Sequence, residues 1–95
     1  MTKLLSQEEI DSALTGKLSR WRQEGDSITR SVKADSFMAG IALVSAVADV
    51  AEERNHHPDI DIRWTTITFT LSTHSEGGLT AFDLRLATDI DGLAG

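Results

Sequence analysis

The sequence predicts an α+β fold of two layers, in which a four-stranded antiparallel sheet carries about three helices packed on one face. Segments with helical periodicity and segments with strand-like alternation follow one another in the order helix, two strands, helix, two strands, helix. No repeat or low-complexity linker interrupts this order. Ninety-five residues are enough for one small core, so we expect a single domain over residues 1–95.

The first helix is predicted by a capping box near the start of the chain. Ser6 would cap its N-terminus, Glu9 would be the reciprocal partner, and Gly16 would end the helix. Two strands are expected next, over residues 18–23 and 27–33, because a glycine and an aspartate between them supply turn chemistry. In the second strand, alternate residues would share one face of the sheet.

The longest helix is expected from residue 37 to about residue 55, after a cap at Asp35 or Ser36. Its apolar positions extend well around the cylinder and leave only a narrow polar strip. Such a helix must be covered on more than one side, and so short a chain has few layers to do that. We therefore expect it to pack on its own sheet and on another subunit. The positions with helical spacing are Phe37, Ile41, Val44, Ala48 and Ala51.

Two further strands are expected over residues 60–64 and 67–71, because apolar residues alternate in opposite phases on either side of a tight turn. This alternation favours a core position for Trp64. After a loop, the last helix is expected to begin at Thr80, with Asp83 as the N3 residue of a second capping box. Glycines near its end would let this helix fray.

Composition disfavours several classes of protein. Nine basic and fifteen acidic residues give a net charge of −6, which argues against binding to nucleic acid or to an anionic membrane surface. There is no cysteine, which excludes disulfides and zinc–thiolate sites. The longest uncharged stretch, residues 36–48, is shorter than the roughly 20 apolar residues of a membrane span. With no signal-peptide pattern, we expect a soluble, cytoplasmic protein.

All three histidines, His56, His57 and His74, lie close together in the sequence. Histidine gives and takes protons near neutral pH, so the cluster indicates proton transfer on a neutral, hydrogen-bonding substrate. Glu52 precedes His56 by one helical turn, and His56 lies at the negative end of the helix dipole. Both effects favour a protonated His56 that is suited to general acid catalysis. Pro58 keeps His57 extended, so its ring should leave the backbone in another direction.

Each of these residues also has a purely structural interpretation. Glu52 and His56 could form an ordinary exposed ion pair, and His57 could simply end the helix. His74 could be an exposed residue at the end of a strand. Asp83 could serve only the capping box of the last helix. A zinc site built from the three histidines is disfavoured, because the chain has no helical His-x-x-x-His pair.

At these positions the sequence resembles the pterin-4a-carbinolamine dehydratase family. The family pattern is an acidic or similar residue, then His-His-Pro, an aromatic residue, a histidine and an aspartate at fixed intervals. The Leu-Ser-Thr-His run and the opening Leu-Ser-x-Glu-Glu helix also match, so the resemblance covers nearly the whole chain. The chain supplies the pattern as Glu52, His56-His57-Pro58, Trp64, His74 and Asp83.

The resemblance implies the same α+β fold and association into a homodimer or homotetramer. It implies a dehydratase that converts 4a-hydroxytetrahydropterin to quinonoid dihydropterin and water, in pterin recycling beside aromatic amino acid hydroxylases. It also implies that the pterin is the substrate and that no other cofactor and no metal is bound.

Under this resemblance, His56 and His74 would form the acid/base pair and His57 would mainly bind the pterin. Glu52 and Asp83 would hold protonation states and ring orientation. Either tryptophan could wall a flat ligand. The catalytic residues would be His56, His57, His74, Glu52 and Asp83. The substrate-binding residues would be His56, His57, Pro58, Thr73, His74, Ser75, Glu76 and Trp21.

A second hypothesis belongs to a different class, an interaction module that stabilises a partner's oligomer. The resemblance allows it, because relatives act as dimerisation cofactors of a transcription factor or as assembly helpers. An idle adaptor has no need of three histidines, and this chain carries all three, so the enzyme is favoured. A small metal-binding protein is a third and weaker hypothesis.

Overall fold

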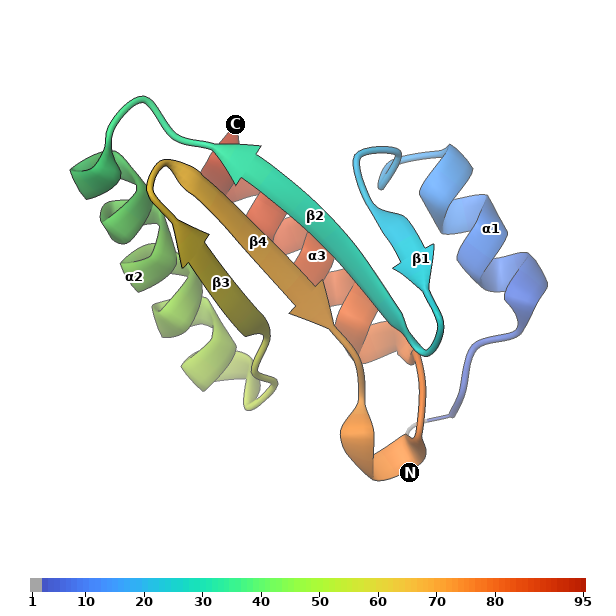
Figure 1. Ribbon diagram of the computed structural model, residues 1–95. Helices are drawn as coiled ribbons and strands as arrows, with labels where there is room; N and C mark the ends of the chain where they lie inside the picture. Colours follow the sequence, from blue (N-terminus) through green and yellow to red (C-terminus); the bar gives the residue numbers. More distant parts are fainter. Residues whose placement is uncertain (1–2) are drawn as a thin grey trace.

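The structure, a computed structural model, describes residues 3–95. It confirms the α+β class: α2 and α3 lie behind a four-stranded antiparallel sheet, and α1 lies beyond the β1 edge (Figure 1). None of the helices within residues 3–95 is long and apolar enough to cross a membrane. The elements are α1 (Gln7–Thr15), β1 (Arg22–Glu24), β2 (Ser27–Lys33), α2 (Phe37–Arg54), β3 (Asp59–Arg63), β4 (Thr66–Leu71), the 3-10 helix η1 (His74–Glu76) and α3 (Ala81–Ala94).

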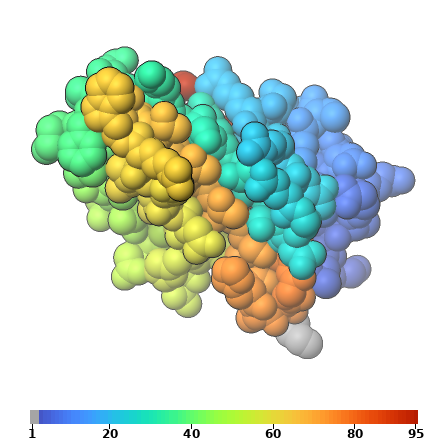
Figure 2. All heavy atoms as spheres, viewed as in Figure 1, coloured from blue at the N-terminus to red at the C-terminus, as the bar shows by residue number. Residues whose placement is uncertain are grey.

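The sheet has the strand order β1-β2-β4-β3, and neighbouring strands are antiparallel. The register of β2 and β4 sets Ile28 opposite Leu71 and Val32 opposite Ile67. Ile28, Ile67 and Leu71 are fully buried in the core between sheet and helices. Alternate residues point to opposite faces of a strand, so the intervening polar side chains lie on the outer face. Figure 2 shows this outer face, where β2, β3 and β4 lie uncovered.

The first strand is shorter than the sequence predicts. Leu18 and Trp21 do not join the sheet; both are buried in a turn that the Trp21 N–H closes on the Leu18 carbonyl (3.0 Å). Only Arg22–Glu24 pairs with β2. The three-residue separation of the two apolar side chains suits a turn rather than the alternation of a strand.

The predicted core position of Trp64 is wrong. β3 ends at Arg63 and β4 begins at Thr66, so Trp64 lies in the two-residue hairpin loop. Its backbone is in the left-handed region (φ 52°) and its side chain is 74% exposed. The chain leaves the alternating pattern at the turn, so the phase of Ile60 and Ile62 cannot be extended to Trp64.

Helix caps set the positions of the loops around the histidines. Both predicted capping boxes are present, Ser6 with Glu9 and Thr80 with Asp83. α2 ends at Asn55, whose left-handed backbone (φ 51°) turns the chain toward β3. α3 does not fray at its internal glycine, contrary to expectation, and continues to the penultimate residue.

Close packing of α2 on β4 depends on Gly40, because a Cβ there would lie 3.0 Å from Cδ1 of Ile67. Gly40 and Ala51 are buried against the sheet layer. The first turn of α2, in contrast, exposes Phe37 (46%) and Met38 (69%). Packing of this helix on its own sheet is confirmed, whereas packing on another subunit stays a prediction.

Candidate active site

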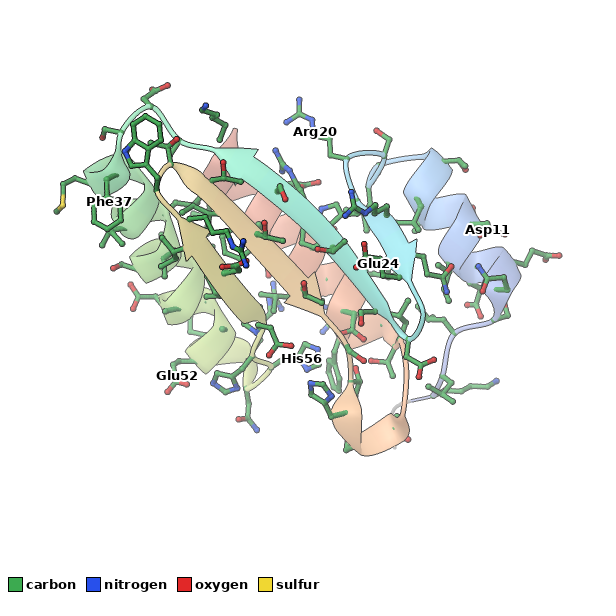
Figure 3. All side chains as sticks on the ribbon, in the orientation of Figure 1. Asp11, Arg20, Glu24, Phe37, Glu52 and His56 are labelled. Atoms are coloured by element: carbon green, nitrogen blue, oxygen red, sulfur yellow. The ribbon has the colours of Figure 1, made fainter. Side chains whose placement is uncertain are left out.

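The end of α2 determines where His56 lies. Asn55 adopts the left-handed conformation that ends many helices, and the His56 N–H donates to the Ala51 carbonyl (3.1 Å). The imidazole of His56 then approaches α3 and is only 11% exposed. Figure 3 shows Glu52 and His56 near the end of α2 that lies away from Phe37.

A buried carboxylate holds this imidazole. Nε2 of His56 lies 2.6 Å from Oδ1 of Asp83, whose side chain is completely buried. The other oxygen, Oδ2, accepts hydrogen bonds from the Thr80 N–H (2.9 Å) and the Thr73 hydroxyl (2.7 Å). Asp83 therefore combines the two interpretations of the sequence, because it completes the capping box of α3 and also orients a histidine.

The expected pairing of Glu52 with His56 is not formed. Glu52 instead bonds Nε2 of His57, and both side chains are largely exposed, 76% and 55%. The left-handed backbone of Asn55 ends the helix before His56, so helical spacing does not bring Glu52 and His56 together. Because the pair is exposed, it contributes at most about 1 kcal/mol to stability.

Phe82 also belongs to this site, although the sequence pattern does not single it out. The centroid of its ring lies 5.7 Å from that of His56 at an interplanar angle of 38°, and its side chain is 39% exposed. The available signal is its place in the first turn of α3, immediately before Asp83. A half-exposed aromatic ring beside a histidine suits contact with a flat ligand.

His74 begins η1, and Ser72 and Thr73 separate it from the end of β4. Gly77 ends η1 in left-handed backbone (φ 74°) and turns the chain back toward α3. His74 and Ser75 are exposed, and Glu76 is half-buried. Pro58, which leads into β3, is half-buried as well. These four side chains are therefore accessible from solvent.

Thr73 differs from the neighbouring residues of its loop that are predicted to bind the substrate. Its side chain is buried, its hydroxyl bonds Asp83, and its N–H donates to the Gly78 carbonyl (2.9 Å). The hydroxyl is thus already engaged and does not face a ligand. Its bond to Asp83 fastens the loop that carries His74 to the same carboxylate that holds His56.

The structure places Trp21 in the core rather than beside the histidines. Its ring is 3% exposed, and its Nε1–H donates to Oδ1 of Asp91 (2.8 Å). Asp91 follows Asp83 by eight residues of α3, a separation of about 12 Å at 1.5 Å per residue. The prediction that Trp21 contacts the substrate therefore finds no support within the single chain.

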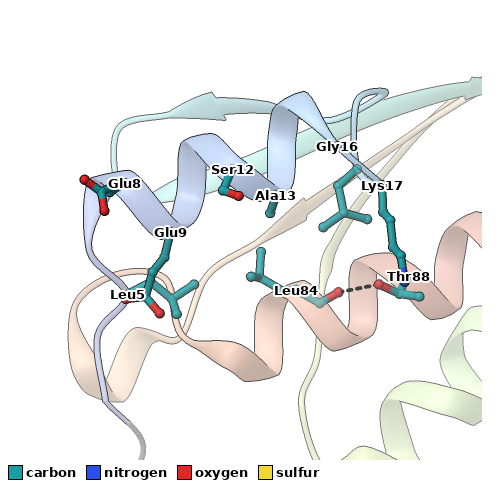
Figure 4. A pocket seen from close by; sticks show the side chains of 10 residues that line it. Leu5, Glu8, Glu9, Ser12, Ala13, Gly16, Lys17, Leu84 and Thr88 are labelled. Carbon is teal, nitrogen blue, oxygen red and sulfur yellow. Dashed lines mark hydrogen bonds between the residues drawn. The ribbon is translucent and has the colours of Figure 1, made fainter.

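The histidines lie outside the open groove between α1 and α3. This groove has a volume of about 740 Å³, and its lining includes Leu5, Ala13 and Leu84 (Figure 4). Two smaller pockets, of about 190 Å³ and 240 Å³, are likewise lined by residues other than histidine. Over residues 3–95, no three His, Asp or Glu side chains are arranged to share a metal ion.

The fold and the cluster define a small α+β domain with a histidine–carboxylate site. A sequence model of the family described as pterin 4 alpha carbinolamine dehydratase matches residues 3–93, and the chain belongs to this family. A Nocardia farcinica protein provisionally named pterin-4-alpha-carbinolamine dehydratase is 60% identical over 93 residues, which are 98% of this chain and 97% of that protein. A Mycobacterium tuberculosis protein with the same provisional name is 51% identical over 92 residues, 97% of each chain.

Solved structures support the same fold. A transcriptional coactivator/pterin dehydratase from Brucella melitensis superposes with a TM-score of 0.93 at 32% identity, covering 98% of this chain and 100% of that one. A pterin dehydratase-like protein identified as a RuBisCO assembly factor in the alpha-carboxysome gives a TM-score of 0.65 at 25% identity, covering 80% and 88%. These names attach different roles to one fold, so the role of this chain has to be argued from its own residues.

Proposed function

We propose that this protein dehydrates 4a-hydroxytetrahydropterin to quinonoid dihydropterin, with His56 and His74 as the acid/base pair. One observation carries the proposal: the carboxylate of Asp83 holds the ring of His56 and also fastens the loop that bears His74. The two histidines come from separate segments, the end of α2 and the start of η1, and share this single anchor. Membership of the pterin dehydratase family supports the choice of substrate.

The reaction needs two proton transfers. The bond between carbon 4a and its hydroxyl oxygen breaks, the oxygen leaves as water after receiving a proton, and a ring nitrogen gives up a proton. Two imidazoles beside one flat ring can divide these tasks, and each transfer typically contributes a factor of about 10² to 10⁴ in rate. Neither step needs a metal or a second cofactor, so the pterin itself is the only small molecule in this scheme.

Binding of the pterin would use the exposed groups around the two histidines. His57 is held by Glu52 and can donate or accept a hydrogen bond at the pterin edge. Ser75 and Glu76 lie in the same loop as His74. Phe82 offers the face or edge of its ring to a planar substrate.

The proposal extends to the cellular setting. A pterin dehydratase of this kind would work in the cytoplasm, in pterin recycling beside an aromatic amino acid hydroxylase. The exposed apolar residues at the start of α2, Phe37 and Met38, support association into a homodimer or homotetramer.

The decisive experiment supplies 4a-hydroxytetrahydropterin to the purified protein and follows the quinonoid product by absorbance. We expect a rate above the spontaneous reaction, lost in His56→Ala and His74→Ala and reduced mainly through weaker binding in His57→Ala. Asp61→Asn, an exposed change on β3, is the matched control and should keep full activity. A wild-type rate equal to the spontaneous one would refute the enzyme, and inactivity of His57→Ala alone would refute the division of roles.

The alternative, an interaction module that stabilises a partner's oligomer, has one observation in its favour. The assembly factor of the alpha-carboxysome has a similar fold, at a TM-score of 0.65. A module of this kind would bind its partner equally well after all three histidines are replaced. The activity assay on the same variants therefore distinguishes the two functions. Elemental analysis that finds one tightly held zinc per chain would favour the third hypothesis, a metal-binding protein.

A further inference from the structure

Two threonine hydroxyls are linked to Asp83 by hydrogen bonds, one directly and one through the other. We infer that they fix His56 in one tautomer. In this arrangement Nε2 of His56 carries the hydrogen that Asp83 accepts, and Nδ1 is the atom that exchanges a proton with the ligand. Thr73 and Thr80 are then positioning residues, since they act through Asp83 and not on the substrate. The assignment of Nδ1 to catalysis depends on the proposed function, whereas the tautomer itself does not.

The hydrogen bonds around Asp83 allow only one consistent set of donors. Oδ2 of Asp83 accepts from the Thr80 N–H and from the Thr73 hydroxyl. The Thr73 oxygen lies 2.7 Å from the Thr80 hydroxyl, and because the single proton of Thr73 is already directed at Asp83, the Thr80 hydroxyl must be the donor of that bond. The Thr80 oxygen in turn accepts from the Phe82 N–H (3.2 Å).

The remaining oxygen of Asp83 faces His56. Both oxygens of an ionised carboxylate are acceptors, so such a group only accepts hydrogen bonds. Imidazole is also a stronger base than a carboxylate, so the proton between the two groups belongs to the ring. The bond of 2.6 Å is therefore donated by Nε2 of His56.

The other ring nitrogen of His56, Nδ1, is available for proton transfer. Within residues 3–95 no buried side-chain nitrogen or oxygen lacks a hydrogen-bond partner, and the side-chain hydrogen bond formed by His56 uses Nε2. Nδ1 therefore reaches solvent. The ring lies between Asp83 and Phe82 with 11% of its side chain exposed, so rotation cannot easily exchange the two nitrogens. A neutral His56 presents Nδ1 as a base, and a protonated His56 presents it as an acid.

The first test is nuclear magnetic resonance of the ¹⁵N-labelled protein without substrate, at a pH high enough to leave the ring neutral. We expect a protonated nitrogen at Nε2 of His56 and an unprotonated nitrogen at Nδ1. The resonances are assigned with His57→Gln and His74→Gln. Thr73→Val, which keeps the shape of the side chain but removes the hydroxyl, should shift the ring toward a mixture of tautomers, and Thr73→Ser should restore the wild-type pattern.

Two results would overturn the inference. One is a wild-type His56 whose Nδ1 carries the hydrogen; the other is a Thr73→Val protein with an unchanged tautomer. Thr88→Val is the matched control, because its hydroxyl bonds a backbone carbonyl on the exposed side of α3. Thr80→Val would also remove the helix cap, so Thr73 is the position to change.

A kinetic test follows if the wild type is an active dehydratase. Thr73→Val should lower kcat by about tenfold to a hundredfold, as misplacement of a catalytic group does, with little change in KM. Thr73→Ser should recover most of the rate, and Thr88→Val should be unaffected. A change in KM alone would contradict a positioning role. An inactive wild type would refute the proposed function, while the tautomer would still be decided by the spectra.

Discussion

Trp64 combines two features that rarely occur together, a left-handed backbone and a mostly exposed aromatic side chain. A bulky residue in this region is disfavoured by about 1 kcal/mol or more. The ring recovers little of this, since the Lys33 ammonium lies 6.0 Å from the ring centroid, at the limit of a cation–π contact. The contacts of the Trp64 ring in the single chain therefore do not offset the strain of its left-handed backbone.

We predict that Trp64→Asn stabilises the isolated chain. Asparagine tolerates the left-handed conformation, so the free energy of unfolding should rise by about 1 kcal/mol in urea titrations. Trp64→Ala separates the two effects, because it removes the ring but keeps an unfavourable backbone. If Trp64→Asn and Trp64→Ala lower the free energy of unfolding equally, the loss of the ring determines the stability change and the backbone strain does not. The exposed indole would then have a packing role.

At the scale of single residues, the sequence predicted local geometry well where a local rule applies. Asp83 was identified because a capping box has a fixed spacing, and the structure confirms that box. The partner of Glu52 was wrong because helical spacing was extended through Asn55, where the helix ends. Phe82 was missed because its contact with His56 crosses from α3 to the end of α2, which no spacing in the sequence encodes.

At the scale of elements, α1 depends on its cap more than the longer helices do. It has nine residues, and isolated helices of this length are marginal. Hydrogen bonds from the backbone and side chain of Ser6 hold the pKa of Glu9 below its usual value of 4.5. A lowered carboxyl pKa means that the unfolded chain binds more protons than the folded one at mildly acidic pH.

This lowered pKa predicts an acid-sensitive contribution to stability. It is fully present above the ordinary pKa of a glutamate and is lost as the pH falls through the lowered value. Thermal unfolding followed over a series of acidic buffers should show a flatter acid limb for Glu9→Gln than for wild type. Glu8→Gln, on the same turn but outside the capping box, is the control. Identical limbs for Glu9→Gln and wild type would contradict the role of the box.

The elements with strong local signals were predicted best. Both capping boxes, the central helix and the strands β2 and β4 were located nearly to the residue. The strand at residues 18–23 was too long because Leu18 and Trp21 are buried by a turn, and burial alone does not distinguish a turn from a strand. The strand order of the sheet is a tertiary property, and the sequence pattern gave the direction of pairing only.

At the scale of the whole molecule, one polar cluster ties the sheet to α3. Arg30 on β2 is 8% exposed and pairs with Asp91, which also accepts the indole hydrogen bond of Trp21. Arg30 is buried whereas the Asp91 side chain is 23% exposed, so removing Asp91 leaves a buried positive charge without compensation. Asp91 thus connects three segments of the chain through a single carboxylate.

We predict that Asp91→Asn lowers the free energy of unfolding by about 3 kcal/mol, measured by urea denaturation. The matched control is Asp61→Asn, which breaks the exposed pair with Arg63 and should change stability by less than about 0.5 kcal/mol. Equal changes in the free energy of unfolding for Asp91→Asn and Asp61→Asn would show that burial of Arg30 does not increase the contribution of its ion pair to stability.

Association is the second prediction at this scale. Apolar side chains that no described element covers favour contact with another copy. Light scattering at micromolar concentration should therefore give a dimer or tetramer, and Met38→Lys should shift it to smaller species. Ser12→Lys, at an exposed polar position of α1, is the control with the same added charge. A monomeric wild type would contradict the subunit contact expected for α2. The exposed large apolar residues are Leu4, Phe37, Met38, Ile62, Trp64, Phe82 and Leu93.

The double use of Asp83 bears on how relatives with this fold are to be judged. A relative that has lost catalytic activity would still be selected to keep the aspartate, because the aspartate completes the capping box that stabilises the N-terminus of α3. Survival of that acid in some other chain therefore says little about whether that chain is an enzyme. Loss of the imidazole at position 56 or 74 leaves the start of the helix intact. Substitutions at those two positions are therefore the clearest sign that a relative has lost catalytic activity.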